Sequence, residues 1–158
     1  MQCPSNTSIF YSMRKGATLE KPIRIKLVYF RTLFSQSGAS LTMGSLAAYL
    51  RSKGFIVDIC LLEKENFHSL GGILDGNSNE RLIVIAKPNF KDFAAVFPLF
   101  RIMKDGAEVS KVFFCGPFAS LNADPMFKEN AWLDGIIIDQ VESVTGELLD
   151  AIRQNRSI

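Results

Sequence analysis

The residues of this 158-residue chain that could do chemistry are few and far apart. His68 is the only histidine, and we interpret it as a surface or packing residue because it follows the second predicted strand, away from the expected ligand crevice. Cys3, Cys60 and Cys115 lack the spacing of a disulfide framework, a zinc site or an iron–sulfur cluster. Cys115 could face the crevice, but a buried thiol usually packs as a small hydrophobe. The sequence therefore predicts no catalytic residue and no metal ligand.

A loop rich in hydroxyl groups follows the first predicted strand. Its hydroxyl side chains are Thr32, Ser35, Ser37, Ser40 and Thr42. Such a loop could cradle the phosphate of a flavin mononucleotide, although Leu33 and Phe34 interrupt it. The dinucleotide-binding fingerprint is absent, because Gly38 is the only glycine in this loop. A small flavodoxin-like protein that binds flavin mononucleotide is therefore one alternative.

The elements that must position these residues begin with a strand, a helix and a second strand. Residues 25–30 are apolar enough for a strand that is buried on both faces. Four apolar residues then recur at helical spacing before the stop signal Gly54, and residues 55–62 are apolar and β-branched again. The four are Leu41, Leu46, Ala47 and Leu50. This pattern indicates a βαβ unit.

The rest of the chain repeats that unit. Further strands are expected at residues 82–86, 111–115 and 135–138, and helices at 90–104 and 142–153, with shorter helices near 64–75 and 125–130. Pro98 predicts a kink or a break in its helix, and Glu142 matches the dipole of the last helix. The last helix is expected to bury Val144, Leu148, Leu149 and Ile152. We therefore predict an α/β fold, a Rossmann-like (flavodoxin-like) doubly wound sheet of five parallel strands in the order 2-1-3-4-5. A ligand crevice is expected at the carboxyl ends of strands one, three, four and five.

The charge and the cysteine content of the chain limit the kinds of partner and compartment that can be expected. The formal net charge is +2 from 18 basic and 16 acidic residues that are mixed along the chain, so no nucleic-acid or membrane-surface partner is indicated. No segment reaches the roughly 20 apolar residues of a membrane span, and scattered thiols indicate a reducing, cytoplasmic compartment. Residues 1–22 are interpreted as an N-terminal arm or leader, and residues 23–158 as one domain.

Several stretches of the chain resemble one family. Residues 44–58, GSLAAYLRSKGFIVD, look like the first helix and second strand of the cobalamin-binding domain that precedes the catalytic barrel in B12-dependent radical SAM enzymes. Pro88-Asn89-Phe90 resembles the segment after the third strand of that domain, and Cys115-Gly116-Pro117 resembles its Gly-Gly-Pro turn. Residues 134–149 resemble its last strand, Gly-Glu-Gly-Glu motif and final helix.

The resemblance implies a domain whose strand ends hold a corrinoid. The corrin ring would lie over the loops after strands one and three, and the nucleotide tail would enter a slot at the turns after strands four and five. The positions that correspond to the cofactor-binding loops are Thr32, Leu33, Phe34, Ser35, Gly38, Pro88, Asn89, Gly116, Pro117, Gln140, Val141 and Glu142. The segment Asn66 to Gly71 imitates a cobalt-ligating Asp-x-His-x-x-Gly motif at the wrong place, so cobalt would have no imidazole ligand from the protein.

The resemblance also implies a partner. The Cys-x-x-x-Cys-x-x-Cys motif that binds an iron–sulfur cluster and the barrel that carries it are absent from this chain, so it would not be catalytic alone. The expected partner is a radical SAM catalytic domain or subunit, which completes methyl transfer or a related radical step.

Two departures from the family pattern keep other functions open. Cys115 replaces the first glycine of the Gly-Gly-Pro turn. Asp139, Gln140 and Val141 occupy the first three places of the Gly-Glu-Gly-Glu motif and leave only Glu142, and a side chain at Val141 would narrow the slot for the tail. The cofactor tail takes another path, or this copy is a degenerate domain without the cofactor. A further alternative is a cofactor-free protein-interaction module that self-associates or docks through phenylalanine-rich segments 90–100 and 113–118.

Overall fold

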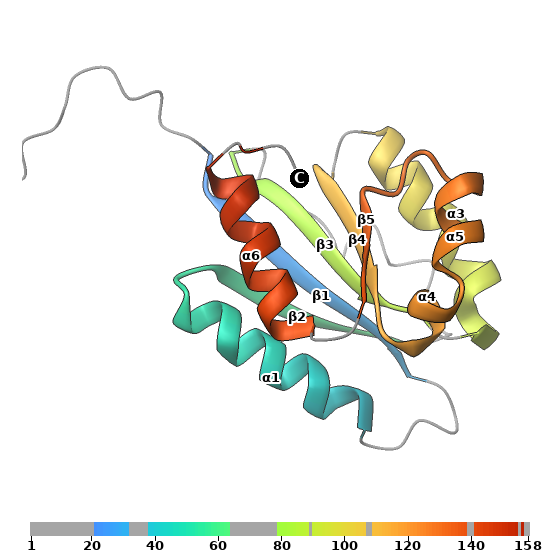
Figure 1. The fold of residues 1–158 in the computed structure, drawn as a ribbon, viewed down its shortest axis with the longest axis horizontal. Helices are drawn as coiled ribbons and strands as arrows, with labels where there is room; N and C mark the ends of the chain where they lie inside the picture. The colour runs from blue at the N-terminus through green and yellow to red at the C-terminus, as the bar shows by residue number, and fades with distance from the viewer. Residues whose placement is uncertain are drawn as a thin grey trace, which may run out of the picture.

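The computed structural model describes residues 21–31, 38–63, 79–88, 90–106, 109–138, 141–154 and 156. These residues form a parallel five-stranded sheet in the order β2-β1-β3-β4-β5 (Figure 1). Its strands are β1 (Ile23–Arg31), β2 (Ile56–Glu63), β3 (Arg81–Lys87), β4 (Lys111–Cys115) and β5 (Gly135–Ile137). The predicted Rossmann-like α/β fold and its strand order are confirmed.

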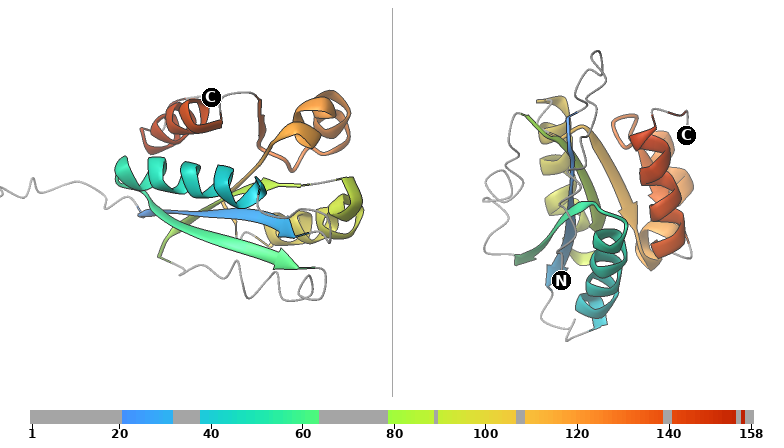
Figure 2. Two further views of the ribbon diagram at one scale, coloured as in Figure 1. Left: turned by 90° about the horizontal axis from the view of Figure 1, so that it is seen from below. Right: turned by 90° about the vertical axis from the view of Figure 1, so that its left-hand side faces the viewer.

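Helices cover both faces of this sheet. They are α1 (Gly38–Ser52), α3 (Phe90–Asp105), α4 (Pro117–Leu121), α5 (Ala123–Glu129) and α6 (Val141–Arg153). Figure 2 shows α1 and α6 on one side of the sheet and α3 on the other. The helix predicted near residues 64–75 and residues 1–20 of the arm lie outside the described residues. The short helix α4 was not predicted, because only five residues form it.

Two apolar cores result, one on each face. The α1-side core joins alternate residues of the strands to α1 and α6, and it includes Ile25, Leu27, Ile83, Ile85, Phe113, Cys115, Leu46, Leu50 and Leu149. The α3-side core takes the intervening strand residues and packs them on α3, α4 and α5, and it includes Val28, Phe30, Val84, Val112, Phe114, Phe100, Ala119 and Met126. Because β3 and β4 are buried on both faces, their interiors are apolar throughout rather than alternating. β1 alternates at its start, where Arg24 and Lys26 are only partly buried, and is apolar from Leu27 to Phe30.

Three helix predictions need correction. Leu41 is 75% exposed, because it lies in the first turn of α1, and Met43 joins the buried face instead. Val144 is also exposed, and the buried side of α6 passes through Thr145 and Gly146. The helix α3 is continuous through Pro98, so of the predicted kink or break the break is wrong.

Five phenylalanines of the phenylalanine-rich segments are core residues or pack against the core. Phe100, Phe113 and Phe114 are buried, and Phe97 and Phe118 are packed against the α3-side core. Phe100 and Phe114 also contact each other edge to face, with ring centroids 5.8 Å apart. These five side chains therefore contribute to the core and not to a docking surface. The side chains of Phe90 and Phe93 lie outside the described residues, so the interaction-module alternative stays a prediction.

One carboxylate connects the amino ends of β4 and β5. Asp134 accepts hydrogen bonds from Nζ of Lys104 and Nζ of Lys111, both at 2.7 Å, and from the backbone nitrogen of Val112 at 2.9 Å. Its side chain is only 13% exposed. Burial alone would raise the pKa of Asp134, but the hydrogen bonds from both lysines and from Val112 outweigh it and lower that pKa. The ionised form of Asp134 therefore stabilises the folded chain.

None of the described helices combines the length and the apolar character needed to cross a membrane.

Two glycines allow a paired test of the packing. A Cβ at Gly135 would lie 2.8 Å from Cδ1 of the buried Phe113, whereas a Cβ at Gly44 in α1 would meet no atom within 4 Å. We expect Gly135→Ala to lower the free energy of unfolding by about 1–3 kcal/mol through overpacking. Gly44→Ala should raise it by about 0.5–1 kcal/mol, because alanine is the better helix former. Urea denaturation of both variants measures this, and equal effects would contradict the packing at Phe113.

Candidate functional site

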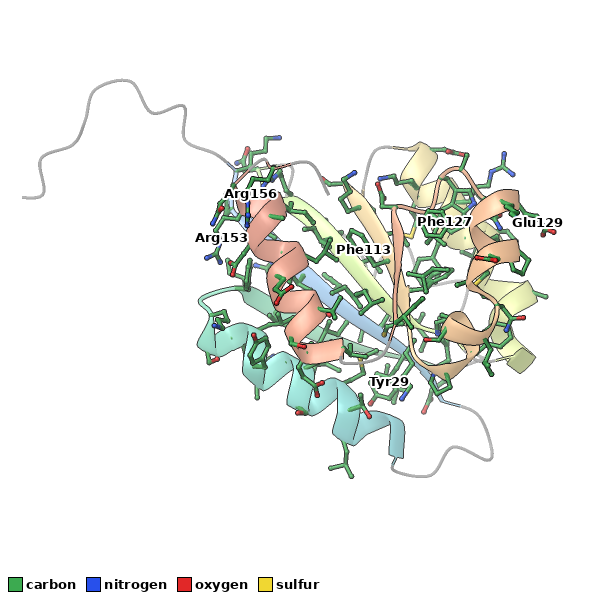
Figure 3. All side chains as sticks on the ribbon, viewed as in Figure 1. Tyr29, Phe113, Phe127, Glu129, Arg153 and Arg156 are labelled. Carbon is green, nitrogen blue, oxygen red and sulfur yellow. The ribbon has the colours of Figure 1, made fainter. Side chains whose placement is uncertain are left out.

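The candidate site lies at the carboxyl ends of the strands, where the chain order reverses. β1 pairs with β2 on one side and with β3 on the other, so the loops after β1 and β3 lead in opposite directions. In open α/β sheets this switch point is where ligands bind. Tyr29 and Lys87 are register partners here, and Figure 3 shows Tyr29 near the end of β1.

Much of the predicted ligand-binding loop set lies outside the described residues. This holds for Thr32, Leu33, Phe34, Ser35, Asn89 and Gln140. Of the others, Gly38 is the first residue of α1, and Pro88 is buried directly after β3. The flavin alternative depends on the same loop: Thr32, Ser35 and Ser37 lie outside the described residues, whereas Ser40 and Thr42 lie in the first turns of α1.

The turn after β4 is the best-defined part of the site. Gly116 has a φ of +91°, a conformation that side chains other than glycine adopt only with strain, and Pro117 starts α4. A Cβ at Gly116 would lie 3.0 Å from Cγ and 3.2 Å from Cε of Lys87. The end of β3 and the turn after β4 are thus in contact, with the aliphatic part of Lys87 lying over Gly116.

Cys115 does not contribute a reactive thiol to this site. Its side chain is 2% exposed and belongs to the α1-side core. Burial raises the pKa of Cys115 to about 12, and the nearby Lys87 ammonium offsets this only in part. The interpretation of Cys115 as a small buried hydrophobe is confirmed.

The start of α6 closes the site on the side of β5. Val141 is its first residue and packs against the α1-side core, so its side chain takes part in closing the space between helix and sheet. Glu142 is partly buried in the first turn of α6, where a carboxylate favours the positive end of the helix dipole.

Thr145 is a buried polar residue of α6 near the candidate site that was not identified from the sequence. It is fully buried one turn into α6, and its hydroxyl has no hydrogen-bond partner among the described residues. A buried hydroxyl left without a partner costs stability, so such groups are uncommon and often face a bound molecule or water. Thr145 lies four residues after Val141 and four before Leu149. This helical spacing within an apolar stripe could have indicated that Thr145 is buried.

No metal-binding cluster is found at this edge. The part of the chain that the structure describes contains no group of three or more histidine, cysteine, aspartate or glutamate side chains that could hold a metal ion. His68 lies outside that part.

Among the described residues, two features would suit a cofactor that is held by shape and backbone, and one would oppose it. Gly116 presents backbone without a side chain, and the unpartnered Thr145 hydroxyl lies on the buried side of α6, which begins at this edge. The Lys87 side chain occupies the space beside Gly116 and would have to rotate away. Lysine side chains are flexible, so this movement leaves the backbone unchanged.

Comparison with known proteins adds no assignment. The sequence matches no protein-family model and has no significant match among curated proteins.

Proposed function

We propose that this chain is a cobalamin-binding Rossmann-like domain that serves a radical SAM enzyme. It would hold a corrinoid at the carboxyl edge of its sheet and present it to a catalytic domain or subunit. When bound, the cobalt of the cofactor would supply methyl transfer or related radical chemistry. The chain's own residues would bind and orient the cofactor.

The observation that carries this proposal is the strand order, which brings the end of β3 and the glycine turn after β4 together beside the switch point. The sheet order 2-1-3-4-5 brings together the strand ends that the family resemblance assigns to the corrin and to its tail. Gly116, at a φ of +91°, stands at the position of the family's Gly-Pro turn. The resemblance of residues 44–58 covers α1 and the first residues of β2, which pack on the same core.

A degenerate form of the same domain is the second candidate. Lys87 over Gly116 and Val141 against the core both occupy space that the nucleotide tail would need. In that case the domain is a cofactor-free scaffold that docks against a catalytic partner or a second copy of itself. Retention of corrinoid by the isolated chain would contradict a cofactor-free domain, and a strictly monomeric protein would contradict docking against a second copy.

Corrinoid retention tests the leading proposal. The purified full chain is incubated with excess hydroxocobalamin and desalted, and its visible spectrum is recorded. We expect a corrin absorbance that stays with the protein in a stoichiometric ratio. Loss of all corrin absorbance on desalting, with no binding at saturating ligand, would refute cofactor binding. The same protocol with flavin mononucleotide should leave the protein colourless, and a retained yellow colour would favour the flavin alternative.

Lys87→Ala separates tail binding from ring binding. Because the variant removes the methylenes that cover Gly116, we expect the affinity for cobalamin to rise by about threefold or more, the reorganisation cost of one side chain. The affinity for cobinamide, a corrinoid without the nucleotide tail, should stay unchanged. Spectroscopic titration of both ligands measures this. A lower affinity for cobalamin would show that the Lys87 ammonium binds the tail instead of obstructing it.

A further inference from the structure

A groove of about 380 Å³ lies between α6 and the edge strand β5. Phe113, which Figure 3 labels between these two elements, and Ile137 of β5 both contribute to its lining. They form the floor of the groove, because only 3% of Phe113 and 2% of Ile137 is exposed. None of the lining residues is among the candidate cofactor-binding positions at the carboxyl edge of the sheet.

One side of α6 forms the helical wall of the groove. Val144, Leu148 and Ala151 line it and recur at helical spacing, so they lie in a row along the helix. Val144 is 40% exposed, and Leu148 and Ala151 are partly buried. An apolar wall beside an apolar floor favours a ligand with an apolar body.

The charged residues that line the groove are both acidic. Asp134 accepts hydrogen bonds from Nζ of Lys104 and Nζ of Lys111, both at 2.7 Å, so its charge is already compensated. Glu147 is exposed on α6, and its carboxylate forms no ion pair with any residue that the structure describes. A cationic group in the groove would therefore find its partner at Glu147.

The Asp134 end of the groove would orient such a ligand. The ammonium groups of Lys104 and Lys111 face a single carboxylate there, which leaves an excess of positive charge. This end repels a cation, whereas Glu147 attracts one. The ligand would therefore place its cationic group beside Glu147 and its apolar part over Phe113 and Ile137.

Other occupants fit this groove less well. An α-helix with its side chains is about 10–12 Å wide, so its backbone would stay outside a groove whose floor is so deeply covered. A second copy that presented the same side of its α6 would bring two Glu147 carboxylates together, and like charges repel. A small molecule with a narrow apolar chain meets neither obstacle.

We propose that the groove between α6 and β5 binds a small molecule that carries an apolar chain and one cationic amine, with the ammonium group paired to Glu147. The apolar chain lies against Phe113, Ile137 and Leu148. The site does not depend on the proposed function, because the two sites share no residue.

Three probes with the same alkyl chain test this site: hexylamine, hexan-1-ol and hexanoate. Amide chemical shifts of the full ¹⁵N-labelled chain are followed at constant pH and ionic strength. We expect saturable shifts at millimolar hexylamine, concentrated at Gly135, Ile136 and Glu147. Hexylamine should bind about tenfold more tightly than hexanoate, with hexan-1-ol between them, because an exposed ion pair favours the cation and disfavours the anion by about threefold each. Methylamine, which has the charge without the chain, should cause no saturable shift.

Two variants at the groove test the roles of charge and space. Glu147→Gln should bring the affinities for hexylamine and hexanoate within about twofold of each other and leave the affinity for hexan-1-ol unchanged. Ala151→Leu places a larger side chain in the groove and should weaken all three probes. Glu129→Gln makes the same charge change on α5, well away from the groove in Figure 3, and should keep the tenfold difference.

Three results would overturn the proposal. Shifts that do not saturate, or that spread over the surface, would show that the groove is not a binding site. A preference for hexylamine that survives Glu147→Gln, or that Glu129→Gln removes equally, would show that Glu147 does not hold the ammonium group. Sedimentation of the chain alone as a dimer that Val144→Glu dissociates would show that a second copy occupies the groove.

Discussion

Asp134→Asn is expected to lower the free energy of unfolding by about 3 kcal/mol, because it removes the only negative charge of a partly buried cluster. The substitution leaves the Lys104 and Lys111 ammonium groups facing each other, with a neutral amide between them. The asparagine oxygen can still accept the hydrogen bond from the Val112 backbone nitrogen. The loss of stability would therefore come mainly from removing the negative charge. Urea denaturation monitored by circular dichroism measures the change.

Asp105→Asn is the matched control for this prediction. Asp105 pairs with Arg101 one turn away on α3, but the two side chains are 66% and 64% exposed and 3.6 Å apart. Removing such a pair should change stability by less than about 0.5 kcal/mol. If both variants lose the same free energy of unfolding, the Asp134 cluster contributes no more to stability than an exposed ion pair.

The pH dependence of stability follows from the same carboxylate. Because the pKa of Asp134 is lower in the folded chain than in the unfolded one, the unfolded state binds more protons between the two values. This stabilisation is fully present above the unfolded pKa of about 3.9 and is lost as the pH falls through the folded pKa. The difference between the wild-type chain and Asp134→Asn should therefore shrink at acidic pH. A difference that stays constant down to acid unfolding would contradict this account.

Gly116→Leu is expected to reduce corrinoid affinity by about tenfold or more if the turn after β4 lines the cofactor slot. The new side chain would fill the space beside the turn that the cofactor tail would enter, and overpacking of a bound ligand by about 1–3 kcal/mol corresponds to about tenfold or more in affinity. The same titration with hydroxocobalamin measures the change.

Gly54→Leu provides the control for backbone strain. Gly54 has a φ of +81°, close to that of Gly116, but a Cβ there meets nothing within 4 Å, and it lies at the opposite edge of the sheet. Both variants should lose about 1–2 kcal/mol of stability from the left-handed backbone. Only Gly116→Leu should lose corrinoid affinity. Equal losses would indicate general destabilisation, and unchanged affinity would refute the slot at Gly116.

The sheet could be predicted from the sequence because each strand is locally unambiguous. The segment Lys111 to Cys115 is apolar, short and bounded by polar residues, and its predicted limits are those of β4. Strand order followed from the alternation of strands and helices together with the right-handed crossover rule.

The helix faces were harder to predict, because they depend on how each helix is rotated against its neighbours. The buried side of α6 is set by its close approach to α1, where a Cβ at Gly146 would lie 2.7 Å from the Tyr49 hydroxyl oxygen. That contact turns Thr145 inward and Val144 outward, and periodicity alone cannot distinguish these adjacent positions.

The location of the candidate site could be predicted from the sequence, but the side-chain contacts within it could not. The switch point follows from the strand order, but the covering of Gly116 by Lys87 depends on the register between β3 and β4. The Asp134 cluster joins residues 23 and 30 positions apart in sequence, and no local pattern indicates such a pairing.

The short length of β5 limits how the sheet can associate. An edge strand exposes backbone groups that can template the addition of another strand, and natural sheets often shorten their edges to prevent this. β5 has only three residues, so an added strand would gain few hydrogen bonds at that edge. Sheet extension into fibrils or strand-exchanged dimers is therefore disfavoured at β5, and a protein that docks near it would have to recognise side chains rather than backbone.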